Sequence, residues 1–420
     1  MVPHVRRRVA ALALLLLVTV GIIGVAIVGT GSGDDTPDVP EGGSSFAVGD
    51  RKTENLSLLD ALAPLLAAGT PTATSGATPT GGSAKQPERP RSAGAPVTAQ
   101  EVAQLFMVGF RGRGPDNAFF DRLALRRWGA VILDGSNYAD ELQFTALASQ
   151  AVSTLQGAGS AAPLVVADQG GGDDNTLPGV GPAAQPSIGS RAEGRAEALR
   201  AGRQLRRLGV RMVVAPSADI GHVGAAWDGR AFSDDVAAVR RRAGGAVRGW
   251  RTAGLAPAVG HFPGEGGASQ DPADGPATVG FSLPELKGGD LKAFGNGLLP
   301  LAPALVVSNA LYAAYDGVTP ATLLPEVPAL ARRMGFRGVV VSGNLAVTVL
   351  ATGGTIADAA VDALKAGCDL LWIPGDAGDQ EAAYRAVVRA VRTGAIPRKR
   401  VRSALAHVTA LKRKYAAAGT

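Results

Sequence analysis

Short apolar runs alternate with amphipathic stretches along most of the chain. Eight runs have the length and composition of strands: 105–110, 130–134, 163–169, 211–220, 255–262, 304–311, 338–344 and 368–374. The segments between them, such as 141–156 and 236–254, carry apolar residues at helical spacing. The pattern therefore predicts strands and helices in regular alternation.

Within these runs the apolar residues are consecutive rather than alternate. This pattern is typical of strands buried on both faces, which occur in parallel sheets covered by helices. Eight strand–helix units in about 320 residues predict a closed (β/α)₈ barrel of the TIM type. A doubly wound open sheet is the alternative, although the glycine-rich segment "DQGGGDD" lacks the spacing of a dinucleotide-binding loop.

The chain before the first of these runs has a different character. Residues 1–8 are basic, and residues 9–29 form an apolar segment close to the roughly 20 residues that cross about 30 Å of hydrocarbon. We expect a cytoplasmic tail and a signal anchor, with the remainder outside the cytoplasmic membrane; cleavage near "VGTGSG" would instead release a secreted protein. Residues 30–96 are rich in Gly, Pro, Ser and Thr and predict a flexible linker, which leaves 97–420 as the folded domain.

Composition and charge narrow the function classes. The chain has 420 residues, of which 46% are hydrophobic and only 5% aromatic, and its net charge is +6. Few aromatic residues and a mild charge argue against a nucleic-acid surface. The basic segment 385–414 has a helical pattern, and we expect its charges to form a solvated face. The single cysteine, Cys368, lies in an apolar run and is expected to be an inert core thiol.

Polar side chains stand where the predicted strands end. They are Asp134, Asp168, Asp219, His261, Asn309 and Asn344. In a barrel these ends share one face, where barrel enzymes carry their active sites. Asp and Asn also end strands by capping loops and helices, so each residue alone has that second interpretation. As a set, they predict a pocket.

Ordered segments of the chain resemble a known family. They are "TAQEVAQLFMVGF", "GAVILDGSN", "ADQGGG", "LGVRMVVAPSADI", "GRAFS", "VGHFPGEG", "YDGVTPATL", "GFRGVVVSGNL" and "ALKAGCDLLWIP". Together they resemble the catalytic barrel of glycoside hydrolase family 3, of the bacterial β-N-acetylhexosaminidase type, over about 97–415. The resemblance implies a retaining mechanism, in which an aspartate attacks the anomeric carbon and a histidine–aspartate pair supplies the proton.

The resemblance also implies sugar-binding residues. Asp168 matches the aspartate of the family's "D-Q-E-G-G-R", and Arg230 matches the arginine of its "R-S-F". His261 matches the first histidine of "K-H-F-P-G-H-G", and Asp271 matches the aspartate of the "D-S-H" loop. These matches predict a pocket for an amino-sugar glycan or a muropeptide, bound through Asp168, Arg230 and His261.

The positions that carry the family's chemistry have changed. The nucleophile position holds Gly343, the carboxylate after it is Asn344, and the catalytic histidine of the "D-S-H" loop is Ala273. Neither glycine nor alanine can attack or transfer a proton, and loss of such groups costs about 10⁴–10⁶ in rate. The second histidine of the "HFPG" motif is Glu265. Two substrate cations are also lost, at Asp173 and Gly260.

Three hypotheses follow from these losses. The first is an anchored pseudoenzyme of peptidoglycan or carbohydrate metabolism that keeps a sugar pocket. The second is an active glycosidase in which Glu265 replaces the acid, assisted by Asp271 or Asp274. The third is an envelope scaffold with a vestigial pocket.

The sequence predicts neither a metal site nor a cofactor. Its four histidines are scattered, and none forms an i, i+4 pair with another. We expect His222 in a loop near the pocket rim and His407 on a helix surface. Glycoside hydrolysis requires no cofactor, and no phosphate-binding loop is present. No oligomeric state is predicted.

Overall fold

The computed structural model describes residues 96–295 and 297–416. The predicted tail, membrane anchor and linker, residues 1–96, therefore lie outside the described residues except for residue 96 itself. Within the described residues no single helix is long and apolar enough to cross a membrane. One pair of helices there, Leu345–Thr352 and Ile356–Ala366, meets the length and composition criteria together, but it is bent by 106°.

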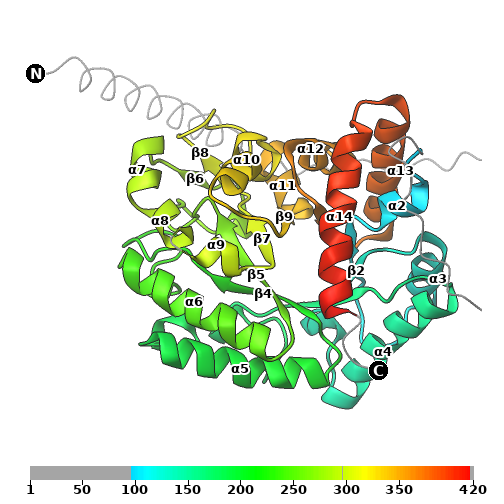
Figure 1. Ribbon diagram of the computed structural model, residues 1–420, viewed down its shortest axis with the longest axis horizontal. Coiled ribbons are helices and arrows are strands. Elements are labelled where there is room, and N and C mark those ends of the chain that lie inside the picture. The colour runs from blue at the N-terminus through cyan, green and yellow to red at the C-terminus, as the bar shows by residue number, and fades with distance from the viewer. Residues whose placement is uncertain (1–95, 296, 417–420) are drawn as a thin grey trace, which may run out of the picture. The chain divides into compact units, whose positions relative to one another are not determined.

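Eight parallel strands close into a barrel in the order β1-β10-β9-β7-β5-β4-β3-β2 (Figure 1). The strands are β1 Phe106–Val108, β2 Ala130–Ile132, β3 Leu164–Asp168, β4 Met212–Ser217, β5 Ala256–Phe262, β7 Ala304–Val307, β9 Val339–Asn344 and β10 Leu370–Ile373. All eight lie within the predicted runs, so the predicted barrel is confirmed and the open-sheet alternative is wrong. Their side chains are almost all buried, because each faces the barrel interior or the surrounding helices.

Helices surround the barrel between successive strands (Figure 1). The described α-helices are α2 Ala99–Ala103, α3 Asn117–Arg126, α4 Glu141–Gly157, α5 Arg191–Arg207, α6 Val236–Thr252, α7 Leu283–Gly288, α8 Asp290–Phe294, α9 Leu298–Leu301, α10 Glu326–Arg333, α11 Leu345–Thr352, α12 Ile356–Ala366, α13 Ala377–Thr393 and α14 Arg398–Tyr415. The two segments predicted from helical spacing are α4 and α6.

One predicted strand, 304–311, is divided in the structure. The barrel strand β7 ends at Val307, and Leu311–Tyr312 forms β8, which pairs with β6 (Thr278–Val279) outside the barrel. At the break the Ser308 hydroxyl accepts a hydrogen bond from the Ala310 amide at 2.9 Å. This side-chain contact turns the chain, and an apolar pattern cannot reveal it.

The helices α5 and α6 approach each other closely through glycines. A Cβ atom on Gly249 would lie 2.3 Å from the Arg195 carbonyl oxygen, and one on Gly245 would lie 2.2 Å from the Arg191 carbonyl oxygen. Each glycine therefore meets the backbone of the facing helix directly. The glycines in "RRRAGGAVRGW" are thus explained by packing.

The C-terminal part of the chain contains three residues with predicted environments: Cys368, His407 and Lys412. Cys368 is buried, and burial raises the pKa of its thiol to about 12, as an inert core thiol requires. His407 lies on α14 as expected and its side chain is 29% exposed, but its Nδ1 lies 2.9 Å from the buried Asp369 carboxylate, which also pairs with Arg332 and Arg400. Lys412 departs from the predicted solvated face, since it is only 7% exposed.

Candidate sugar pocket

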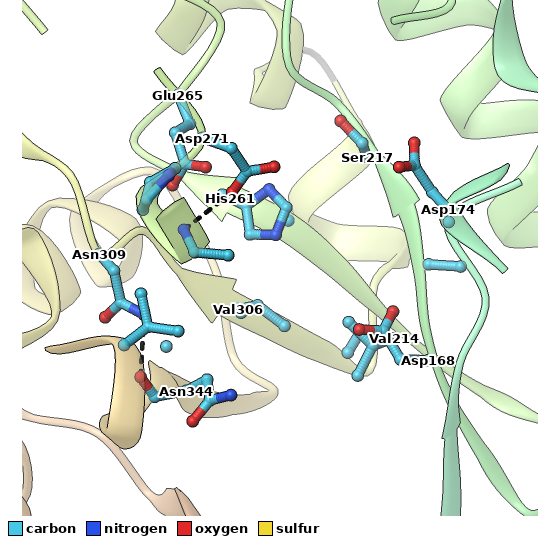
Figure 2. A pocket seen from close by; sticks show the side chains of 18 of the residues that line it. Asp168, Asp174, Val214, Ser217, His261, Glu265, Asp271, Val306, Asn309 and Asn344 are labelled. Carbon is cyan, nitrogen blue, oxygen red and sulfur yellow. Dashed lines mark hydrogen bonds between the residues drawn. The ribbon is translucent and has the colours of Figure 1, made fainter. Parts of the chain in front are cut away.

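A cavity of about 280 Å³ opens at the carboxyl ends of the barrel strands (Figure 2). Most positions carried over from the family resemblance line it, with Asp173 as the exception. The lining includes Asp168, Arg230, His261, Glu265, Asp271, Ala273, Gly343 and Asn344. The sequence alignment to the family motifs therefore brought together residues that are far apart in the chain but adjacent in space. The strand ends supply most of them, as expected for a barrel.

The six polar strand ends divide into two groups. Asp168, His261, Asn309 and Asn344 line the cavity. Asp219 is fully buried behind His261. Asp134 does not line the cavity, because it caps the 3₁₀ turn Gly135–Asn137, where its carboxylate accepts the Ser136 amide at 2.7 Å. For Asp134 the capping interpretation was therefore the right one.

His261 is held in a fixed orientation by Asp219. Its ring Nδ1 donates to Asp219 Oδ2 at 2.8 Å, and its amide donates to the same oxygen at 3.1 Å. Burial would lower the pKa of His261, but the negative charges of Glu265 and Asp219 and the hydrogen bond to Asp219 outweigh it and raise the pKa to about 10. The ring is therefore an imidazolium at neutral pH.

Glu265 lies beside His261 in a buried network. Its Oε2 accepts the Ser308 hydroxyl at 2.5 Å, and its amide donates to Asp219 Oδ1 at 2.7 Å. Burial is the largest influence on this carboxyl and raises its pKa, although the charge of His261 opposes the shift. A raised pKa moves a carboxyl toward the range that suits a general acid, which is the role expected for Glu265 in the second hypothesis.

Asp168 faces the pocket from the end of β3, at right in Figure 2. Burial raises the pKa of its carboxyl to about 7, with the charge of His261 acting in the opposite direction. It is therefore poised between its neutral and ionised forms near neutral pH. Such a group can both donate to and accept from a sugar hydroxyl.

Arg230 reaches the pocket but is already bound by two carboxylates. Its Nη2 lies 2.8 Å from Asp174 Oδ1, and its Nη1 lies 2.7 Å from Asp271 Oδ2. The guanidinium also stacks 4.5 Å from the ring centre of Trp227, which itself lines the cavity. Asp271 is thus part of an ion pair: burial would raise its pKa, but the Ala273 amide and Arg230 lower it.

Asp174 and Trp227 are pocket residues that the sequence did not identify. The motif comparison pointed to Asp173, whose side chain is exposed and does not line the cavity, whereas its neighbour Asp174 binds Arg230. Two consecutive aspartates, Asp173 and Asp174, follow the glycine-rich segment, and this pair indicated that one of them could face the pocket. Nothing in the spacing of Trp227 indicated a pocket position.

The position that matches the family's nucleophile by motif, Gly343, is filled by a neighbouring side chain. A Cβ atom on Gly343 would lie 2.3–2.6 Å from the Oδ1, Cγ and Nδ2 atoms of Asn309. Asn309 is fixed there, because its Nδ2 donates to the Asn344 carbonyl at 3.0 Å (Figure 2) and its Oδ1 accepts the Thr348 hydroxyl at 2.8 Å. The side chain of Asn344 caps α11 by accepting the Ala346 amide.

The remaining points about the site are the position of His222 and whether the described residues could hold a metal ion. His222 lies in a loop, as expected. It pairs with Asp290 at 3.3 Å and is not among the residues that line the cavity. Among the described residues no group of three or more His, Cys, Asp or Glu side chains could hold a metal ion. The arrangement offers a ligand hydrogen bonds, a cation and carboxyl groups whose pKa values are raised by burial.

Comparisons with known proteins agree with this geometry. The model of the glycosyl hydrolase family 3 N-terminal domain matches residues 97–411. A β-hexosaminidase from Stenotrophomonas maltophilia is 29% identical over 195 residues, which are 46% of this chain and 58% of that protein. The β-hexosaminidase LpqI of Mycobacterium tuberculosis is 29% identical over 388 residues, covering 85% of this chain and 96% of LpqI. The chain therefore spans little more than half the length of some curated relatives and nearly all of another.

Solved structures show the same similarity. A family 3 β-N-acetylglucosaminidase from Paenibacillus has a TM-score of 0.73 at 28% identity, over 78% of this chain and 64% of that one. A β-N-acetylhexosaminidase from Beutenbergia cavernae has a TM-score of 0.68 at 26% identity, over 76% and 99% of the two chains. By its barrel, its pocket and the family model that covers most of its length, the chain belongs to the glycosyl hydrolase family 3 N-terminal domain family.

Proposed function

We propose that this family 3 protein binds an amino-sugar glycan or a muropeptide in the barrel pocket without efficient hydrolysis. The single observation that carries the proposal is the nucleophile position, where Gly343 offers no carboxylate and Asn309 fills the space beside it. The names of its relatives support the sugar class, since they are β-hexosaminidases and a β-N-acetylglucosaminidase. The pocket supports binding, because Asp168, His261 and Glu265 present polar atoms to it.

The test compares turnover with binding. The purified full chain and LpqI are assayed side by side with a chromogenic N-acetylglucosaminide, and we expect turnover at least about 10⁴-fold below that of LpqI. N-acetylglucosamine and muropeptide fragments at millimolar concentration should raise the melting temperature, because a ligand that binds only the folded state stabilises it. Turnover similar to that of LpqI would contradict the proposal. No thermal shift with any of these sugars would instead favour a scaffold with a vestigial pocket.

A second candidate function is hydrolysis with Glu265 as the acid. The favouring observation is its buried carboxyl, which has a raised pKa and a Ser308 hydrogen bond and lies in the pocket. If turnover is found, Glu265→Gln should abolish it, while the control Glu326→Gln, at an exposed glutamate that does not line the pocket, leaves it unchanged. Undiminished turnover of Glu265→Gln would reject this role.

Rescue of the family chemistry requires three changes. Gly343→Asp restores the nucleophile and Ala273→His restores the acid/base histidine, but the new aspartate collides with Asn309. We therefore expect activity from Gly343→Asp/Ala273→His only when Asn309→Ala is added. Equal activity of the double and triple variants would show that Asn309 does not obstruct this position.

We also propose that residues 9–29 anchor the protein in the cytoplasmic membrane with the barrel outside. The support is the uncharged segment preceded by three arginines, Arg6–Arg8. Cell fractionation should find the full chain in the membrane fraction, accessible to protease added outside, and the variant lacking 9–29 inside the cell. Recovery of the full chain in the cytosol would contradict this proposal.

A further inference from the structure

A second cavity, of about 730 Å³, lies at the end of the barrel opposite the sugar pocket. The segments that precede β3 and β4 contribute to it, together with α4 and the last turns of α14. Its lining residues are Gln104, Ala148, Ser149, Val152, Ser153, Gln156, Ala161, Ala162, Pro163, Gly209, Arg211, Thr409, Lys412, Arg413 and Ala416. It shares no residue with the sugar pocket.

The charges around this cavity are all positive. Arg211, Lys412 and Arg413 line it, and the lining contains no aspartate or glutamate. Lys412 is only 7% exposed, and its Nζ donates to Gln104 Oε1 at 2.7 Å. Arg211 is half-buried, and its Nη1 donates to the carbonyls of Arg206 and Val210 at 3.2 and 2.9 Å. Within the described residues neither Lys412 nor Arg211 has a carboxylate in ion-pairing distance.

Burial of these cations without a counter-ion is unfavourable. Burial lowers the pKa of Lys412 to about 8 and lowers that of Arg211 as well. Charged groups in protein interiors are ordinarily paired, because removal from water costs several kcal/mol per ion. Residues kept at such a cost to stability are often functional. An anion in the cavity would supply the missing partner.

The residues that line the cavity indicate the chemistry of the ligand beyond its anionic group. Ala148, Val152, Ala161, Ala162 and Pro163 give it apolar surface next to the cations. Its volume is within the range of small-molecule sites, about 300–1,000 Å³. A site with apolar walls, one buried cation and one half-buried cation complements a molecule with one acidic head and an apolar body. Arg211 also has the planar fork that suits a carboxylate.

We propose that the cavity between α4 and the end of α14 binds an amphiphilic carboxylate. The carboxylate lies between Lys412 and Arg211, and the aliphatic or aromatic body lies along the alanine, valine and proline wall. Binding here is separate from binding in the sugar pocket, because the two cavities open at opposite ends of the barrel. The proposal holds whether or not the sugar pocket hydrolyses its ligand.

The test is isothermal titration of the full chain in lipid nanodiscs with 4-phenylbutanoate. The neutral 4-phenylbutanol serves as the uncharged probe, and acetate serves as the probe without an apolar body. The variant is Lys412→Met, and the matched control is Lys414→Met, an exposed lysine that does not line this cavity. Arg211→Met is the second variant, and circular dichroism checks that each variant is folded.

We expect saturable binding of 4-phenylbutanoate that weakens at least about tenfold in Lys412→Met or Arg211→Met and is unchanged in Lys414→Met. The alcohol and acetate should each bind at least about tenfold more weakly than 4-phenylbutanoate. The proposal is overturned by absence of saturable binding up to about 10 mM. Equal binding of the acid and the alcohol, or equal binding by the wild type and both folded variants, would overturn it as well.

Discussion

At the scale of single residues, the most informative contact joins Gly343 and Asn309. A glycine alone at position 343, which matches the family's nucleophile by motif, would leave a gap that one substitution could refill. Here the Asn309 amide occupies that place and is held by Asn344 and Thr348. A carboxylate at position 343 therefore has no room in the packed pocket, and both positions must change together to admit one.

Gly343→Asp is expected to destabilise the protein by about 1–3 kcal/mol, because its Cβ overlaps the Asn309 side chain. Chemical denaturation of Gly343→Asp, Asn309→Ala and the double variant measures the coupling. The double variant should be more stable than the sum of the single effects predicts. Gly280→Asp is the control, since a Cβ there meets nothing within 4 Å. Strict additivity of the two changes would contradict the overlap.

Asp168 is expected to make the protein less stable as the pH rises. Its folded pKa of about 7 exceeds the unfolded value of about 3.9, so the folded state binds more protons between these limits and stability falls across that range. Asp168→Asn should remove this fall and stabilise the protein by about 1–2 kcal/mol at pH 8, less than the full shift because the side chain is partly exposed. Urea denaturation at pH 4.5 and 8 tests it, with the exposed Asp121→Asn as control. An unchanged pH dependence in Asp168→Asn would contradict the assignment.

At the scale of elements, the interface between α5 and α6 depends on glycines in both helices, each of which contacts the backbone of the facing helix. Gly245 and Gly249 of α6 face carbonyls of α5, and Gly194 of α5 faces the Arg242 carbonyl. Helix propensity alone would disfavour glycine at each of these places by about 1 kcal/mol relative to alanine. Close packing of the two helices offsets that cost.

Gly249→Ala should therefore destabilise the protein by about 1–3 kcal/mol, because the methyl group would collide with the Arg195 carbonyl. Gly244→Ala in the same helix is the matched control, since a Cβ there has no neighbour within 4 Å. That control should be stabilised by up to about 1 kcal/mol through helix propensity. Melting temperatures of the two variants separate the effects, and a stabilising Gly249→Ala would show that the helices can move apart without cost.

At the scale of the whole molecule, the barrel places two cavities at opposite ends. The sugar pocket contains both carboxyls and cations, whereas the second cavity contains cations without carboxylates. Burial raises the pKa of Asp168 in the sugar pocket and lowers the pKa of Lys412 in the second cavity, so it disfavours the charged form of each group. Both therefore reduce the stability of the unliganded protein near neutral pH.

Lys412→Met is expected to stabilise the unliganded protein by about 1–2 kcal/mol at pH 7, because burial disfavours the charged amine. The folded pKa of about 8 lies below the unfolded value of about 10.4, so wild-type stability should rise between these pH values, and the variant should lack that rise. The effect should add to that of Asp168→Asn within about 0.5 kcal/mol, since the two sites share no partner. Denaturation of the single and double variants measures this. Destabilisation by Lys412→Met would show that its bond to Gln104 outweighs the burial cost.

The sequence alone predicted the barrel and most of its pocket. Consecutive apolar residues require burial on both faces, which only a covered parallel sheet provides, so β4 and β9 could be placed within a few residues. The ordered motifs pointed to Asp168, Arg230 and His261, and all three line the pocket, although Arg230 lies in the loop after β4 rather than at a strand end. The division of 304–311 was missed, because a hydroxyl contact at Ser308 ends the strand inside an apolar run.

Local pattern thus determined which segments are strands and which residues gather at their carboxyl ends, because both follow from periodicity and from the shared face of a barrel. Tertiary structure decided what each side chain contacts. It placed Asp134 on a turn, Asp174 on Arg230 and Asn309 beside Gly343, and it buried Lys412 in a cavity without a carboxylate. These outcomes depend on atoms brought together from distant parts of the chain, and no local pattern of residues contains that information.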